Sequence, residues 1–216
     1  MGIYSIVAFF QKGGLFMYPI LLVFAVGMSI AVERWVELTR TRNQNRKMWL
    51  QLQPVLVQGE FDKAREIVND DRSTISQMLS MGLARQGAVR RREDIEIAME
   101  ESMMEIIPQL EKRTPYVALL SNIATLLGLL GTIMGLIEAF TAVANANPAE
   151  KADLLSASIS VAMNTTAFGL MVAIPLLLIH AKLSSTTGQI VDSLEMASVK
   201  ALNSISNFTK RQHTAD

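Results

Sequence analysis

Three long uncharged runs dominate the pattern of hydrophobic and polar positions along the chain. They cover residues 13–32, 116–137 and 154–181. A helix needs about 20 consecutive apolar residues to cross the hydrocarbon core of a bilayer, and each run is long enough. The pattern therefore predicts an all-α integral membrane protein with three transmembrane helices.

The charged stretches beside these runs also have helical composition, so we expect long helices that extend into the cytoplasm. Helix is expected over 15–40, 90–142 and 154–209, with no sheet in 38–113, and with bends at Pro108 and Pro115. The expected division is an outer interfacial amphipathic helix 1–12, TM1 13–36, a cytoplasmic helical region 37–115, TM2 116–140, a short periplasmic loop 141–153, TM3 154–182 and a cytoplasmic C-terminal helix 183–216.

The basic residues predict the orientation of the chain. Five of them follow the first run directly: Arg34, Arg40, Arg42, Arg46 and Lys47. An excess of Lys and Arg marks the cytoplasmic side, and the loop after the second run has only Lys151. We therefore expect a periplasmic N-terminus and a cytoplasmic C-terminus. A cleaved signal peptide is the alternative for the first run, but the run is too long and its basic residues follow it.

Composition argues against several classes of function. The formal net charge is zero, so the chain lacks the basic surface with which proteins bind nucleic acid. Cysteine is absent, which excludes disulfides and thiolate chemistry, and only His180 and His213 offer imidazoles. No nucleophile–base pair or metal-ligand cluster is visible. We expect neither an enzyme nor a bound metal or cofactor.

Small and weakly polar residues recur on the second and third runs at intervals of three or four. Such intervals place them on one helical face. On the second run they are Thr125, Gly128, Thr132, Gly135 and Ala139. On the third they are Ser158, Ala162, Thr165 or Thr166, Gly169 and Ala173, with Ser156, Ser160 and Asn164 as a polar flank.

Two interpretations of these stripes remain open. Small residues let membrane helices approach closely, which predicts packing roles for Gly128, Gly131, Gly135 and Gly169. Polar groups at membrane depth usually face a bundle interior or a water-filled path. That reading predicts an ion path lined by Thr125, Thr132, Ser158, Asn164, Thr165 and Thr166. Glu138, at the outer end of the second run, is either an interfacial anchor or an ion-attracting group at a pore mouth.

Three segments resemble one known family. GGLFMYPILLVFAVGMSIAVERW, residues 13–35, looks like the first span of the MotA/TolQ/ExbB proton channel family, with its glycine pair, M-x-P-I and closing E-R-W. LLGLLGTIMGLIEAF, residues 126–140, resembles the second-span motif, and SISVAMNTTAFGLMVAIPLLLIHA, residues 158–181, the third. The order and spacing match over nearly the whole chain, whose size is closer to ExbB and TolQ than to MotA.

The resemblance implies a bacterial inner-membrane protein that forms a homo-oligomeric ring of five copies. The ring would surround two copies of an ExbD/TolR-like single-span partner whose span carries the ion-binding aspartate. A TonB- or TolA-like energy transducer would be a further partner. Thr132 and Thr166 match the threonines that line the partner-facing cavity. Val161 departs from the pattern, because the ExbB and TolQ branch usually has a glutamate there.

The expected function is that of an ion-channel (stator or motor) subunit. It would convert an ion-motive force into mechanical work on a partner, for biopolymer or TonB-dependent transport or for envelope maintenance. The ion would be H⁺, or Na⁺ if Asn164 and Thr165 coordinate it through oxygen atoms. The alternatives are a non-conducting membrane scaffold and a small transporter that binds a solute at the polar stripe.

Overall fold

The computed structural model describes residues 14–86 and 92–213, which form six α-helices and no β-strand. The helices are α2 (Met17–Gln58), α3 (Phe61–Asp70), α4 (Thr74–Arg85), α5 (Arg92–Glu111), α6 (Thr114–Asn145) and α7 (Lys151–His213). The predicted all-α fold is confirmed. The interfacial helix expected over 1–12 lies outside the described residues.

Three helical stretches are long and apolar enough to cross a membrane. They lie in α2, in Arg92–Asn145, and in Lys151–Phe208 of α7. This agrees with the three runs in the sequence, and the chain is a multi-pass membrane protein. The expected ranges 15–40 and 154–209 are exceeded, because α2 continues to Gln58 and α7 continues to His213.

The described chain divides into two compact units. The membrane unit comprises residues 14–34 and 113–182, and the extramembrane unit comprises residues 35–86, 92–112 and 183–213. Helices α2 and α7 contribute residues to both units, α6 belongs to the first, and α3, α4 and α5 belong to the second.

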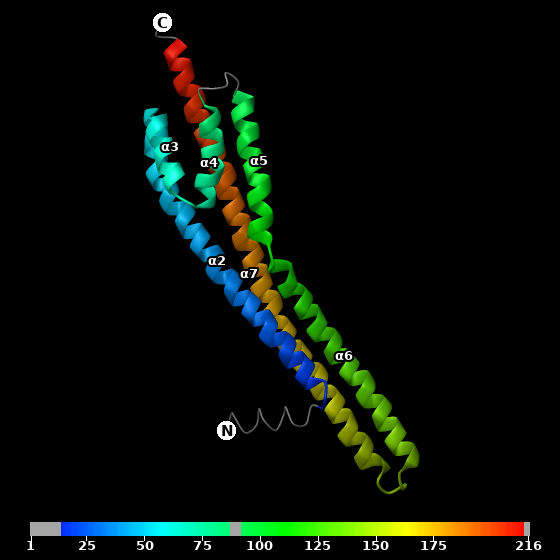
Figure 1. Cartoon of the computed structure of the whole chain (residues 1–216). Coiled ribbons are helices and arrows are strands. Elements are labelled where there is room, and N and C mark those ends of the chain that lie inside the picture. Colours follow the sequence, from blue (N-terminus) through cyan, green and yellow to red (C-terminus); the bar gives the residue numbers. More distant parts are fainter. Residues whose placement is uncertain (1–13, 87–91, 214–216) are drawn as a thin grey trace. The chain divides into compact units, whose positions relative to one another are not determined.

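In the membrane unit, α6 and the first part of α7 run side by side and are joined by a short loop (Figure 1). The first span packs against α7 through one face: Met17 and Ile20 are fully buried, and a Cβ built at Gly27 would lie 3.0 Å from the Leu176 side chain. The opposite face stays open, with Leu22 at 66% exposure. The exposed side chains of this face are apolar, as expected of a helix surface that contacts lipid.

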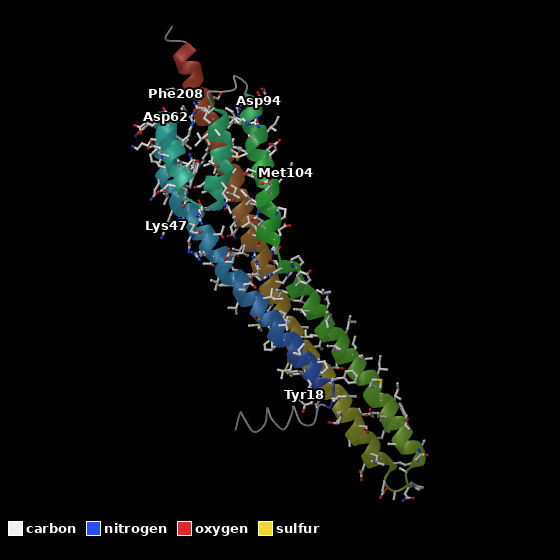
Figure 2. All side chains as sticks on the ribbon, in the orientation of Figure 1. Tyr18, Lys47, Asp62, Asp94, Met104 and Phe208 are labelled. Carbon is white, nitrogen blue, oxygen red and sulfur yellow. The ribbon has the colours of Figure 1, made fainter. Side chains whose placement is uncertain are left out.

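The extramembrane unit has an apolar core of the kind found in water-soluble helical proteins. Its fully buried large side chains are Leu38, Leu52, Leu56, Ile75, Met78, Leu79, Leu83, Met99 and Leu183. The later part of α7 presents the seam that its intervals of three and four predict, with Ile190, Leu194, Ala197 and Ala201 buried. Phe208, labelled in Figure 2, packs its ring edge-on against Phe61 at a centroid distance of 5.3 Å. Burial of such residues is the main stabilising force of this unit.

Asn45 of α2 joins the start of α4 through a buried amide. Its Nδ2 donates to Thr74 Oγ1 at 2.7 Å, and its Oδ1 accepts from the Ile75 backbone N–H at 3.2 Å. Asn45 is 3% exposed, so this side chain takes the place that water would have at the first turn of α4. These hydrogen bonds explain why Asn45, a polar residue, is buried on the apolar face of α2.

Asp71 completes the cap of α4 beside this contact. Its Oδ2 accepts from the Ser73 backbone N–H and from the Ser76 hydroxyl, both at 2.8 Å. Ser73 is the N-cap residue and accepts from the Ser76 N–H at 3.4 Å. Partial burial alone raises the pKa of the Asp71 carboxyl, but the hydrogen bonds from Ser73 and Ser76 outweigh it and lower that pKa below its ordinary value.

The helix expected over 90–142 is interrupted near Pro115, one of the two positions where a bend is predicted. Helix α5 ends at Glu111, and α6 begins at Thr114. The break lies before Pro115, which occupies the first turn of α6, where a missing N–H costs least. Pro108 lies within α5 without ending it. Arg113 adopts a left-handed φ of 65°, and its guanidinium pairs with Glu33 at 2.5 Å.

The cap of α4 predicts a pH-dependent contribution to stability. The folded pKa of Asp71 lies below the unfolded value, so the ionised carboxylate favours folding. This contribution is complete above the unfolded pKa of about 3.9 and is lost as the pH falls through the folded value. Asp71→Asn should therefore lower the melting temperature at about pH 7, and the difference from wild type should shrink towards about pH 3.

Circular dichroism melting of the purified protein in detergent, over a pH series, measures this difference. Asp70→Asn is the matched control, since Asp70 is exposed at the end of α3 and should change the melting temperature little at any pH. A difference for Asp71→Asn that stays constant over the whole series would contradict the proposed role of its carboxylate.

Candidate functional site

The backbones of α6 and α7 touch at two glycines in the middle of the membrane unit. A Cβ built at Gly169 would lie 2.7 Å from the carbonyl oxygen of Ala124, and one built at Gly128 would lie 3.3 Å from the Cα atoms of Gly169 and Thr166. These are contacts with backbone atoms, which cannot move aside as a flexible side chain can. Gly169 therefore requires glycine for the helices to lie this close, and a side chain at Gly128 would be tightly packed against the backbone of α7.

The other two glycines of α6 extend the same contact. A Cβ at Gly135 would lie 2.9 Å from the Cβ of Ala162, and one at Gly131 would collide with the side chain of Thr165. All four glycines for which we predict packing roles thus lie where α6 meets α7. No hydrophobic force drives membrane helices together within lipid. Small residues at such a contact let the backbones come close enough for van der Waals packing to hold the helices together.

Thr132 and Thr166 meet at this contact. Their Oγ1 atoms lie within hydrogen-bonding distance of each other. Thr166 Oγ1 also lies 2.9 Å from the Gly128 carbonyl oxygen, and Thr132 Oγ1 lies 3.2 Å from the same oxygen and 3.3 Å from that of Ala162. Each hydroxyl has a single proton, so the oxygen acceptors outnumber the protons that are available.

This excess of acceptors determines what the site can do. Two hydroxyl oxygens and two backbone carbonyl oxygens converge, so at any moment some lone pairs have no donor. Such oxygens accept from a protonated carboxyl or coordinate a hard cation, and a hydroxyl can also donate to a carboxylate. Both threonines are partly exposed in the single chain, whereas Gly128 and Ala162, which supply the carbonyls, are buried.

The remaining stripe residues differ in their surroundings. Thr165 is 2% exposed and donates its hydroxyl to the Val161 carbonyl at 3.0 Å, so it is closed to ions in this conformation. Thr125 donates to the Ser121 carbonyl of its own helix at 3.3 Å. Asn164 and Ser158 are partly exposed. The structure thus brings Thr132 and Thr166 together and separates them from Thr165, which faces inward.

Two further predicted positions lie near the ends of the site. Glu138 is fully on the surface of α6, six residues beyond Thr132. Val161 is partly buried, and its Cγ1 would lie 3.2 Å from a Cβ built at Gly14. The position of the family's glutamate is therefore apolar here and borders the start of the first span. Nothing at Val161 binds a proton.

Ser121 is an interhelical contact that the stripe pattern left out. Its hydroxyl is fully buried and donates to the Ala173 carbonyl of α7 at 2.7 Å. Ser121 lies four residues before Thr125, and the interval that defines the stripe could have included it. A second missed contact lies at the start of α6, where the His180 ring nitrogen Nδ1 is 3.1 Å from the Thr114 carbonyl oxygen.

No metal site accompanies these contacts. In the residues that the structure describes, no group of three or more His, Cys, Asp or Glu side chains could hold a metal ion. The oxygen cluster at Thr132 and Thr166 consists of neutral groups only.

Comparisons with known proteins agree on one family. Residues 70–196 match the MotA/TolQ/ExbB proton channel family. The chain is 30% identical over 189 residues to a putative biopolymer transport protein of Synechocystis sp. named ExbB-like 1. The aligned residues make up 85% of this chain and 72% of the relative. It is 34% identical over 87 residues to the Tol-Pal system protein TolQ of Haemophilus influenzae, 40% of this chain and 38% of the relative. It is 47% identical over 57 residues to the biopolymer transport protein exbB1 of Vibrio cholerae, 26% of this chain and 25% of the relative.

The backbone contact between α6 and α7 predicts opposite effects of one substitution at two glycines of α7. Gly169→Ala should destabilise the protein by about 1–3 kcal/mol, because the new methyl meets a backbone carbonyl. Gly188→Ala is the control, since no atom lies within 4 Å of a Cβ built there. It should be neutral or stabilising by up to about 1 kcal/mol, through the better helix propensity of alanine.

Thermal unfolding in detergent, followed by circular dichroism, compares the two variants. If Gly169→Ala is as stable as Gly188→Ala, the two helices are not held by a glycine contact.

Proposed function

The chain belongs to the MotA/TolQ/ExbB proton channel family, and on that premise we propose that it is the ring-forming subunit of an ion-driven motor in the bacterial inner membrane. At the coarser level it is an ExbB/TolQ-type subunit of a membrane channel or energy-transduction system. The proposal adds that ion flow past Thr132 and Thr166 does mechanical work on a partner, for biopolymer transport or envelope maintenance.

The observation that carries this proposal is the oxygen cluster between α6 and α7. Thr132 and Thr166 supply hydroxyls that reach each other and the Gly128 carbonyl, in partly exposed positions. A group that crosses the membrane beside such a cluster finds hydrogen-bond partners in either protonation state. A purely apolar contact would offer none.

The composition of the spans supports a partner that brings the ion-binding group. Residues 116–137 and 154–181 contain no Asp, Glu, Lys or Arg. A proton carrier at mid-membrane must therefore belong to another chain. We propose an ExbD/TolR-like single-span partner with a membrane aspartate, present as a dimer inside a ring of five copies of this chain. A TonB- or TolA-like transducer would receive the force.

The proposed orientation places the N-terminus in the periplasm and the C-terminus in the cytoplasm. The basic residues after the first span support it, as does the near absence of basic residues between α6 and α7. In this orientation Glu138 lies on the periplasmic side, where a carboxylate would attract cations towards the path.

A scaffold that does not conduct ions is the second candidate, and one observation favours it. Both threonine hydroxyls lie within reach of backbone carbonyls, as they would in a contact that only fastens two helices. The two functions differ in what a hydroxyl-to-methyl change should do. Fastening depends on shape and on one modest hydrogen bond, whereas conduction depends on the hydroxyl itself.

Thr132→Val and Thr166→Val should therefore assemble normally and lose most ion-driven activity. A hydrogen bond to a charged group is worth about 1.5–3 kcal/mol, which corresponds to a loss of about ten- to a hundredfold. Thr166→Ser should keep more activity because its hydroxyl remains. Thr141→Val is the matched control on α6 and should keep its activity, since Thr141 is exposed, lies outside the predicted ion path and donates its hydroxyl to the Ile137 carbonyl of its own helix.

Assembly and ion-coupled activity of these variants are measured side by side, with the partner co-expressed. Full activity of both valine variants would show that the ion path does not depend on these two residues. If the protein is only a scaffold, valine at these positions should be tolerated as far as its shape fits. Serine should then preserve function no better than alanine.

The ion itself is tested by withholding sodium at a fixed proton gradient. A proton-driven motor keeps its activity. Loss of activity would favour a sodium route past Asn164, which is partly exposed; Thr165, which is buried, is no longer part of our proposed path.

The ring predicts a definite mass. Native mass spectrometry of the protein, extracted in mild detergent, should give an oligomer of five copies, with two copies of the partner when both are co-expressed. A stable monomer under conditions that keep α6 and α7 folded would contradict the ring.

A further inference from the structure

A shallow groove of about 600 Å³ runs along one face of α2 directly after the first apolar run. Its walls include Trp35, Thr39, Arg40, Asn43, Gln44 and Lys47. All of them are exposed, and each lies three or four residues from another member of the set, so they share one side of the helix. Trp35 is the first of the lining residues along α2, and Lys47, labelled in Figure 2, is the last.

The cationic side chains of the groove are available to bind an anion. Neither Arg40 nor Lys47 forms an ion pair with any residue in the described ranges. The two lie seven residues apart, or about 10 Å along the axis, so their long side chains can converge on a group held between them. Asn43 and Gln44 lie in that interval and offer amide N–H donors. No acidic residue lines the groove.

The position of the groove specifies where its ligand lies. Trp35 is three residues after Val32, the last residue of the first apolar run, and it is 48% exposed. Tryptophan at such a place typically lies in the headgroup layer of a membrane. Arg40 follows about 7.5 Å further along the helix, which is close to the thickness of that layer.

We propose that this groove binds the phosphate of an anionic phospholipid headgroup, held by Arg40 and Lys47 and bordered by Trp35. The proposal goes beyond the motor function and does not depend on ion conduction. A lipid fits better than a soluble anion because the membrane end of the groove is apolar: Trp35 and Val36 are 48% and 59% exposed there. Such a site would fix the height of α2 at the membrane surface.

The experiment measures lipid binding to the full-length, delipidated protein in detergent by native mass spectrometry. The probes are phosphatidylglycerol, which is anionic, and phosphatidylcholine, which is not. Wild type should retain phosphatidylglycerol preferentially. Arg40→Gln/Lys47→Gln should lose at least about tenfold in affinity for it, as expected when charge-assisted hydrogen bonds are removed.

Arg42→Gln/Arg46→Gln is the matched control. It changes the net charge equally in the same segment, and both residues are exposed and outside the groove lining. It should bind phosphatidylglycerol nearly as well as wild type, and Arg40→Lys/Lys47→Arg, which keeps both charges, should do the same. Circular dichroism confirms that each variant is folded.

Three outcomes would overturn the site. Equal losses in the two glutamine variants would mean that only diffuse charge attracts the lipid. Equal retention of both lipids by wild type would remove the preference for an anion. Displacement of phosphatidylglycerol by excess inorganic phosphate would identify a site for a soluble anion instead of a lipid.

Discussion

The close approach of α6 and α7 at Gly128 and Gly169 is the constraint on which the membrane unit depends. Lipid tails are as apolar as leucine, so no hydrophobic force drives two membrane helices together. Their contact must come from dispersion between backbones and from hydrogen bonds across the gap, and both need a short separation. At Gly169 a single methyl group would already meet the Ala124 carbonyl oxygen. The same separation lets the Ser121 hydroxyl reach the Ala173 carbonyl and the Thr166 hydroxyl reach Gly128.

The extramembrane unit is held by different forces, because its surroundings are different. Its helices bury large apolar side chains such as Met78, Leu79 and Met99, and its surface carries the charges that the spans lack. Polar groups here fix helix ends. Asn45 binds the first turn of α4 from a neighbouring helix. One chain thus uses water-driven burial in one unit and backbone contact in the other, although α2 and α7 contribute to both.

The sequence predicted the spans and the stripes well, because a bilayer allows few solutions for a long apolar helix. It placed the glycines at a helix contact and singled out Thr132 and Thr166. Sequence patterns did not predict the features that depend on a single residue. An interval of three or four cannot distinguish Thr165 from Thr166, although neighbours on a helix point about 100° apart. The Thr166 hydroxyl reaches the Gly128 carbonyl, whereas the Thr165 hydroxyl donates to the Val161 carbonyl of its own helix. Two prolines looked equivalent, but Pro115 lies in a first turn and Pro108 within a helix. The bond from Asn45 to α4 joins residues 30 positions apart and has no local signal.

The glycine contact and the threonine pair are two consequences of one feature. A backbone carbonyl within a membrane helix is normally covered by the side chains around it. At Gly128 there is no side chain, so the carbonyl oxygen accepts from Thr166 of the other helix as well as from Thr132 of its own. Glycine therefore brings the helices together and also opens a polar acceptor at that point. A hydroxyl beside two acceptors can exchange one for the other by rotating about a single bond, with the helices unmoved. In our proposal, a neutral cluster that rearranges in this way would meet the carboxyl of a partner in either protonation state, without an ionisable residue of its own.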